Sequence, residues 1–146
     1  MAKWVRPTLN TKYHIDFDWW AEQGLNFRSY LSSQLCDECK PKYADARAAE
    51  LVDWVDPVTA EVKRVDALWQ ALKSCCSTRA DYIAETTPLT TAIFRMFLAN
   101  DNTPLSPAEL AENLAKRGSR RYSAEDILRT LSRGPIYRGI KPVPTE

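Results

Sequence analysis

The chain has 146 residues, of which 45% are hydrophobic and 27% charged, and its formal net charge is +1. This composition is ordinary for a globular protein, and the length allows one domain or two small ones. No run of 18 apolar residues occurs and the N-terminus lacks the apolar core of a signal peptide, which excludes a membrane span and predicts a cytoplasmic protein.

The near-neutral net charge hides an asymmetry between the two ends of the sequence. Residues 103–146 contain eight basic and five acidic side chains, a net charge of +3, whereas the first 102 residues contain twelve basic and fourteen acidic ones, a net charge of −2. This distribution favours an anionic partner for the C-terminal part.

The first half predicts an unstructured arm over residues 1–11, a short strand over residues 12–17, and one helix that starts at Asp18 and runs directly into Cys36. The helix is indicated by apolar or small residues at three- and four-residue steps, namely Phe17, Trp20, Gly24, Phe27, Leu31 and Leu35. Two β-prone runs, residues 51–55 and 62–65, flank an Asp-Pro turn and predict a hairpin. Asp66 is then expected to cap a further helix.

The second half carries three consecutive helix starts. Thr87 is expected to cap the first, with Pro88 in the first helical position. Ser106 and Glu109 form a capping-box pattern, which a second box beginning at Ser123 repeats. The apolar residues of the third helix, Ile127, Leu128 and Leu131, are expected to point into the core.

A segment of strand character, residues 136–140, follows the three helices. Helix, turn, helix and strand in this order resemble a winged helix-turn-helix domain over roughly the last 55 residues. The turn, residues 118–122, is longer than the usual three or four residues, and one strand is recognisable where the wing normally has two. The resemblance implies that the turn, the third helix and the wing contact DNA.

The cysteines form a Cys36-x-x-Cys39 pair and an adjacent Cys75-Cys76 pair. The first spacing lets two thiolates meet one tetrahedral ion, and Cys75 and Cys76 could complete a zinc site. Adjacent cysteines seldom bind the same ion, so His14 could replace one of the second pair. The alternative is a set of buried structural thiols at helix ends. A thioredoxin-like redox site is disfavoured because the βαβ context is missing.

Neither the single histidine nor the glycines favour an enzyme. His14 is interpreted as a structural residue, because no catalytic motif accompanies it, and four glycines leave little room for phosphate-cradling loops. One of the neighbours Trp19 and Trp20 is expected at a surface, either in a protein contact or under the N-terminal arm.

A basic cluster occupies the segments that contact DNA in winged-helix proteins. Its members are Arg120, Arg121, Arg129, Arg133, Arg138 and Lys141. Glu125 and Asp126 in the first turn of the third helix would repel phosphates, so a solvated face of a protein-binding domain is the competing interpretation.

We therefore expect an α+β, mostly helical protein. An N-terminal helix–hairpin–helix region (residues 1–84) would carry the four cysteines, and a winged-helix-like domain would cover residues 85–146. The leading hypothesis is a non-enzymatic protein that binds double-stranded DNA, of the transcriptional-regulator type, as a homodimer or with a partner. The alternative is an adaptor that binds another protein through the winged helix and exposed aromatic residues.

Overall fold

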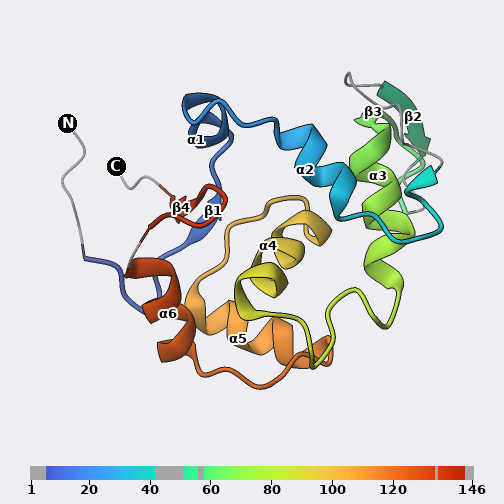
Figure 1. The fold of residues 1–146 in the computed structure, drawn as a ribbon. Helices are drawn as coiled ribbons and strands as arrows, with labels where there is room; N and C mark the ends of the chain where they lie inside the picture. The colour runs from blue at the N-terminus through green and yellow to red at the C-terminus, as the bar shows by residue number, and fades with distance from the viewer. Residues whose placement is uncertain (1–5, 42–50, 56–57, 134, 144–146) are drawn as a thin grey trace.

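The computed structural model describes residues 6–41, 51–55, 58–133 and 135–143. Its α-helices are α1 (Phe17–Glu22), α2 (Phe27–Ser33), α3 (Ala67–Ser74), α4 (Leu89–Ala99), α5 (Pro107–Lys116) and α6 (Ala124–Ser132). Its strands are β1 (Tyr13–Ile15), β2 (Leu51–Val55), β3 (Val62–Asp66) and β4 (Ile140–Pro142), and a short 3-10 helix, η2, spans Cys76–Thr78. The predicted α+β, mostly helical class is confirmed (Figure 1).

Three predicted N-terminal helix caps are confirmed, because in each the capping side chain accepts from backbone N–H groups of its own helix. Ser106 accepts from the N–H of Glu109, whose carboxylate accepts from the N–H of Ser106, so the capping box is confirmed. Ser123 and Asp126 form the same reciprocal pair at the start of α6. Asp66 caps α3 by accepting from the N–H groups of its second and third residues.

Two helix predictions were wrong. The single helix expected from Asp18 is two helices, because Gly24 adopts a left-handed φ of 67° and Asn26 starts α2 as a new cap. The expected cap at Thr87 does not form: the Thr87 hydroxyl accepts instead from the N–H of Ala84, and α4 starts after Pro88 without a side-chain cap.

Strand β1 joins the two ends of the chain. It pairs antiparallel with β4, with Ile15 opposite Ile140, and on its other side Tyr13 exchanges two backbone hydrogen bonds with Leu105, between α4 and α5. The strand expected over residues 136–140 thus forms later, at Ile140–Pro142, where it has a partner. In Figure 1, β1 and β4 lie side by side above α6.

One core connects the first and the second half of the sequence. The buried cluster includes Tyr13, Leu31 and Leu72 from the first half, and Phe94 and Ile127 from the second. The indole N–H of Trp20 on α1 donates to the carbonyl of Arg138, just before β4. The boundary expected between residues 84 and 85 therefore passes through a common core.

Aromatic rings fill the space between α1, α2, α3 and α4. Trp20 contacts Phe27 and Tyr30 of α2, and Tyr30 meets Phe94 of α4 edge to face at 5.0 Å. Trp19 is half-buried and packs edge-on against Trp20, with ring centroids 5.7 Å apart. The larger part of both indoles is thus used inside the molecule.

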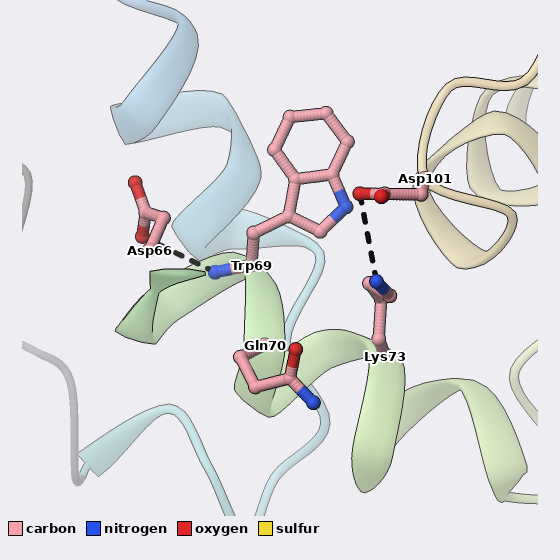
Figure 2. Close-up of a pocket in the computed structure, with 5 residues that line it drawn as sticks. All are labelled: Asp66, Trp69, Gln70, Lys73 and Asp101. Carbon is pink, nitrogen blue, oxygen red and sulfur yellow. Dashed lines mark hydrogen bonds and ion pairs between the residues drawn. The ribbon is translucent and has the colours of Figure 1, made fainter. Parts of the chain in front are cut away.

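Helix α3 is attached to the end of α4 by polar contacts around a small pocket of about 210 Å³ (Figure 2). The indole N–H of Trp69 donates to the carbonyl of Leu98, and Lys73 forms a 3.5 Å ion pair with Asp101.

Strands β2 and β3, which precede α3, pair antiparallel with Val55 opposite Val62, as the predicted hairpin requires. Residues 56–57 of the expected turn lie outside the described residues.

Candidate metal centre and basic face

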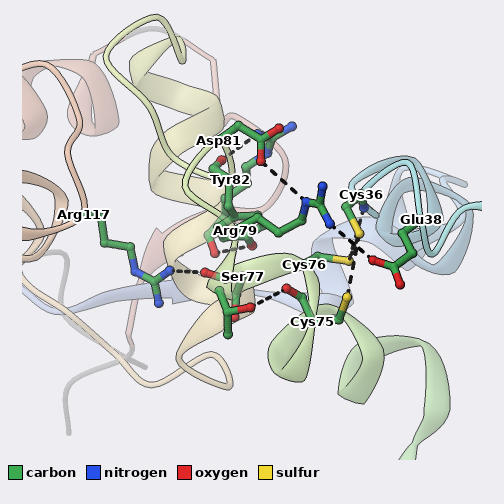
Figure 3. A network of polar contacts seen from close by, with 11 residues as sticks. Cys36, Glu38, Cys75, Cys76, Ser77, Arg79, Asp81, Tyr82 and Arg117 are labelled. Atoms are coloured by element: carbon green, nitrogen blue, oxygen red, sulfur yellow. Dashed lines mark hydrogen bonds and ion pairs between the residues drawn. The ribbon is translucent and has the colours of Figure 1, made fainter.

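The cysteines come together where the segment after α2 meets the end of α3, and Figure 3 shows Cys36 beside Cys75 and Cys76. Cys36 and Cys39 belong to the turn that follows α2, and this turn is closed by hydrogen bonds from the N–H groups of Cys39 and Lys40 to the carbonyl of Cys36. Cys75 is the C-cap of α3, and Cys76 begins η2. Two segments about forty residues apart in sequence thus meet through their sulfur atoms.

The sulfur atoms are close enough to surround one ion. The Sγ of Cys36 lies 3.3 Å from that of Cys76 and 4.0 Å from that of Cys75. The Sγ atoms of Cys36, Cys39 and Cys75 all lie within 4.8 Å of one another. In a tetrahedral zinc–thiolate site with Zn–S bonds of about 2.3 Å, neighbouring sulfurs are about 3.8 Å apart. Three cysteines therefore stand in an arrangement that could hold a metal, and all four are free thiols.

The cysteines differ in their surroundings. Cys39 and Cys76 are buried, whereas Cys36 and Cys75 are partly exposed. Burial acts to raise the pKa of Cys36, but hydrogen bonds with Cys76, Cys39 and Cys75 outweigh it and lower the pKa to about 7. Burial raises the pKa of Cys39 and of Cys76. Of these three thiols, Cys36 is the one whose pKa is lowered, so its surroundings favour the thiolate.

Positive charge lies next to this sulfur. Arg79, three residues after Cys76, places its guanidinium beside Cys36 and forms ion pairs of 3.3 Å with Glu38 and 3.8 Å with Asp81 (Figure 3). The charge of Cys36 is the main cause that raises the pKa of Arg79. A polar cavity of about 190 Å³ adjoins the site and is lined by Cys36, Cys76 and Arg79, among others.

The basic residues expected to form one cluster are divided between two environments. Four arginines are exposed: Arg120 and Arg121 in the loop before α6, Arg129 on α6, and Arg133 at its C-cap. Arg129 makes a 3.5 Å ion pair with Asp126, one turn earlier in the helix. The other three form no ion pair with any of the described residues, so their guanidinium groups are available to a ligand.

Arg138 and Lys141 do not share this exposed surface. The guanidinium of Arg138 lies over the ring of Tyr30 at 4.0 Å and near that of Tyr137 at 4.7 Å, and burial lowers its pKa. Lys141 forms a 3.4 Å ion pair with Asp16. Both residues thus contact the N-terminal half, which sequence spacing alone could not indicate.

A groove on α6 brings in an arginine that the sequence did not single out. Arg6 and Pro7 of the N-terminal arm face α6 across a cavity of about 340 Å³. The helix side of this cavity is formed by Glu125, Leu128, Arg129, Ser132 and Arg133. Leu128 therefore lines the groove, and the expectation that it points into the core was wrong. We call this feature the α6 groove.

No protein-family model matches the chain, and neither a curated protein nor a solved structure matches it. Among the described residues, no helix combines the length and the apolar character needed to cross a membrane.

The single histidine, His14, lies on β1 opposite Lys141. It is far from the cysteines in sequence, and its strand pairs the two ends of the chain.

Proposed function

We propose that this protein is a non-enzymatic DNA-binding protein of the transcriptional-regulator type, which binds double-stranded DNA through α6. We also propose that its four cysteines bind a structural zinc ion. The observation that carries the first part is the exposed face of α6. Three arginines, Arg6, Arg129 and Arg133, line one groove on this face. Guanidinium groups placed along a helix are well suited to phosphates and guanine edges.

The elements around α6 support a winged-helix-like reading. Helices α4, α5 and α6 follow one another, and the segment at Leu105 and strand β4 both pair with β1. In this proposal β1, from the other end of the chain, takes the place of the strand that the sequence after α6 does not supply. Arg120 and Arg121 in the preceding loop would flank the DNA contact.

Two acidic residues of α6, Glu125 and Asp126, would repel DNA phosphates, and contacts within the protein reduce this repulsion for Asp126. Asp126 is held by the capping box and by Arg129, so part of its charge is already balanced. Glu125 lines the α6 groove directly. We therefore expect binding that depends strongly on salt and that weakens steeply as counterions compete for the arginines.

Zinc is proposed because three cysteines already stand in a metal-binding arrangement and the Sγ of Cys76 lies 3.3 Å from that of Cys36, so that four thiolates would make a closed, tetrahedral site. Such a site stabilises a fold and leaves no position for substrate. It would join the segment after α2 to the end of α3, which β2 and β3 separate in the sequence. A reducing compartment such as the cytoplasm is compatible with the four free thiols.

The test of DNA binding is a salt-dependent titration of a labelled duplex. Arg129→Ala/Arg133→Ala should weaken binding on every sequence and lower the salt slope by about two, roughly one per phosphate contact. Lys40→Ala/Lys73→Ala is the control for charge: Lys73 belongs to α3, Lys40 lines the cavity beside the cysteines, and α3 lies on the side of the molecule away from α6 (Figure 1). Equal losses in both double variants would reject α6 as the DNA contact.

The test of the metal is its content in the purified full chain. About one equivalent of zinc is expected, and Cys39→Ser should reduce it strongly, since Cys39 is a buried member of the cluster. Metal-free protein with an unchanged thermal melt would leave the four cysteines as buried structural thiols.

A protein-binding adaptor is the second candidate, and it rests on exposed apolar side chains near β2 and β3. Val55, Val58 and Val62 are 57%, 91% and 63% exposed. Such a patch is more typical of a protein contact than of a DNA-binding face. Absence of any duplex binding at low salt would favour this candidate.

A further inference from the structure

Two of the four thiols are placed for a reaction that the CxxC spacing does not suggest. The Sγ atoms of Cys36 and Cys76 lie 3.3 Å apart, closer than those of Cys36 and Cys75 at 4.0 Å, although Cys36 and Cys76 are forty positions apart in sequence. The N–H of Cys36 also donates to the Sγ of Cys76 at 3.2 Å. A disulfide needs an S–S separation of about 2.05 Å, so small side-chain rotations would join this pair.

The same two residues are the cysteines that line the polar cavity beside the cluster. Cys36 is partly exposed, whereas Cys76 is 1% exposed. A small polar reactant that enters the cavity therefore has easier access to the Sγ of Cys36 than to that of Cys76. The guanidinium of Arg79 lies beside Cys36 and offers N–H donors to a leaving oxygen (Figure 3).

We propose that Cys36 and Cys76 form a peroxide-reactive dithiol, with Cys36 as the attacking sulfur and Cys76 as the resolving one. This inference rests on the proposed zinc site and adds that the site is sensitive to oxidants. Cys39 and Cys75 are the remaining ligands and take no part in the first reaction.

The reaction balances with a hydroperoxide as the oxidant. The Cys36 sulfur attacks one oxygen of hydrogen peroxide, the O–O bond breaks, and the departing hydroxide is protonated to water, which leaves a sulfenic acid on Cys36. The Cys76 sulfur then attacks the Cys36 sulfur, the S–O bond breaks, and a second water leaves with the thiol proton. Two thiols lose two electrons in total, and one peroxide becomes two waters.

A disulfide between Cys36 and Cys76 would remove two of the four proposed zinc ligands. Cys39 and Cys75 cannot complete a tetrahedral protein site by themselves, so the ion should be released. Oxidation and metal release are thus expected to occur together, with one zinc per disulfide.

The experiment treats the reduced full-length protein with one equivalent of hydrogen peroxide and follows free thiols, released zinc and the peptide map. The four thiols should fall to two, and the map should contain the Cys36–Cys76 disulfide. In Cys76→Ser, dimedone should label Cys36, whereas Cys39→Ser should still form the disulfide. Predominant Cys36–Cys39, Cys75–Cys76 or intermolecular disulfides, or dimedone labelling at Cys39 or Cys75, would overturn the proposal.

The two proposals fail separately in this experiment. A protein that forms the Cys36–Cys76 disulfide but contains no zinc supports the dithiol and rejects the metal. A protein that contains one zinc and keeps both zinc and four thiols after peroxide rejects the dithiol and leaves the metal site standing.

Discussion

Gly139 offers a quantitative test of how the two ends of the chain are joined. It has a φ of 79°, and an added Cβ would lie 2.7 Å from the indole nitrogen of Trp20 and 3.1 Å from the carbonyl oxygen of Asp16. Gly118 is the matched control, because its φ of 89° is similarly left-handed but an added Cβ would have nothing within 4 Å. The two alanine variants therefore share the backbone cost and differ in the steric clash.

The expected magnitudes follow from these contacts. The left-handed backbone should cost both variants about 1–2 kcal/mol of unfolding free energy. Gly139→Ala must also displace the buried indole of Trp20 and its 2.9 Å hydrogen bond to Arg138. Leaving such buried groups unpaired costs about 1–3 kcal/mol more. Gly118→Ala should thus lose about 1–2 kcal/mol, and Gly139→Ala about 2–5 kcal/mol.

Urea denaturation followed by tryptophan fluorescence measures both values in the full-length chain. The difference between the variants should be at least about 1 kcal/mol, the lower limit for the lost indole contacts. Equal destabilisation of the two variants would refute the close approach of Gly139 to α1, and with it the junction of α1 and β4.

Two further predictions concern the start of α5. Ser106→Ala should lower the unfolding free energy by about 1 kcal/mol, because it removes the buried half of a capping box; a thermal melt identical to wild type would contradict this. A hydrogen bond from Lys12, followed by that from the Ser106 N–H, lowers the pKa of Glu109 below its ordinary 4.5. The resulting stabilisation is complete above that ordinary value and is lost as the pH falls through the lowered folded-state pKa. Glu109→Gln should therefore reduce the loss of unfolding free energy at acid pH. Parallel stability curves of the variant and wild type against pH would contradict this.

The sequence predicted the features of this fold that depend on neighbouring residues. The capping boxes at Ser106 and Ser123 need only a hydroxyl and a carboxylate three residues apart, and both formed. Thr87 shows the limit of such reasoning, since a competing N–H at Ala84 captured its hydroxyl.

Features that depend on distant segments could not be read from local patterns. The pairing of β1 with β4 joins residues more than 120 positions apart, and it is this pairing that fixes where the last strand begins. Arg138 was assigned to an exposed basic cluster, but packing placed it over Tyr30 of α2. Leu128 turned toward the N-terminal arm, whose Arg6 faces α6 without any sequence signal to indicate it.

The cysteines combine a feature that local sequence predicts with one that depends on distant segments. Their spacing pointed to a metal site of four cysteines, and three of them, Cys36, Cys39 and Cys75, stand in an arrangement that could hold an ion. It did not reveal that the Sγ of Cys76 would lie 3.3 Å from that of Cys36, which follows from how α3 ends against the turn after α2. Arg79 could have been suspected only from its position three residues after Cys76.

The most direct test of the central claim is an amide NMR titration of the full-length chain with a short DNA duplex at low salt. We predict that chemical-shift changes concentrate on the N-terminal arm at residues 6–8, the loop over residues 119–123 and helix α6, and that they disappear at high salt. Shifts confined to the region of β2 and β3, or no shifts at duplex concentrations in excess of the protein, would contradict DNA binding through α6.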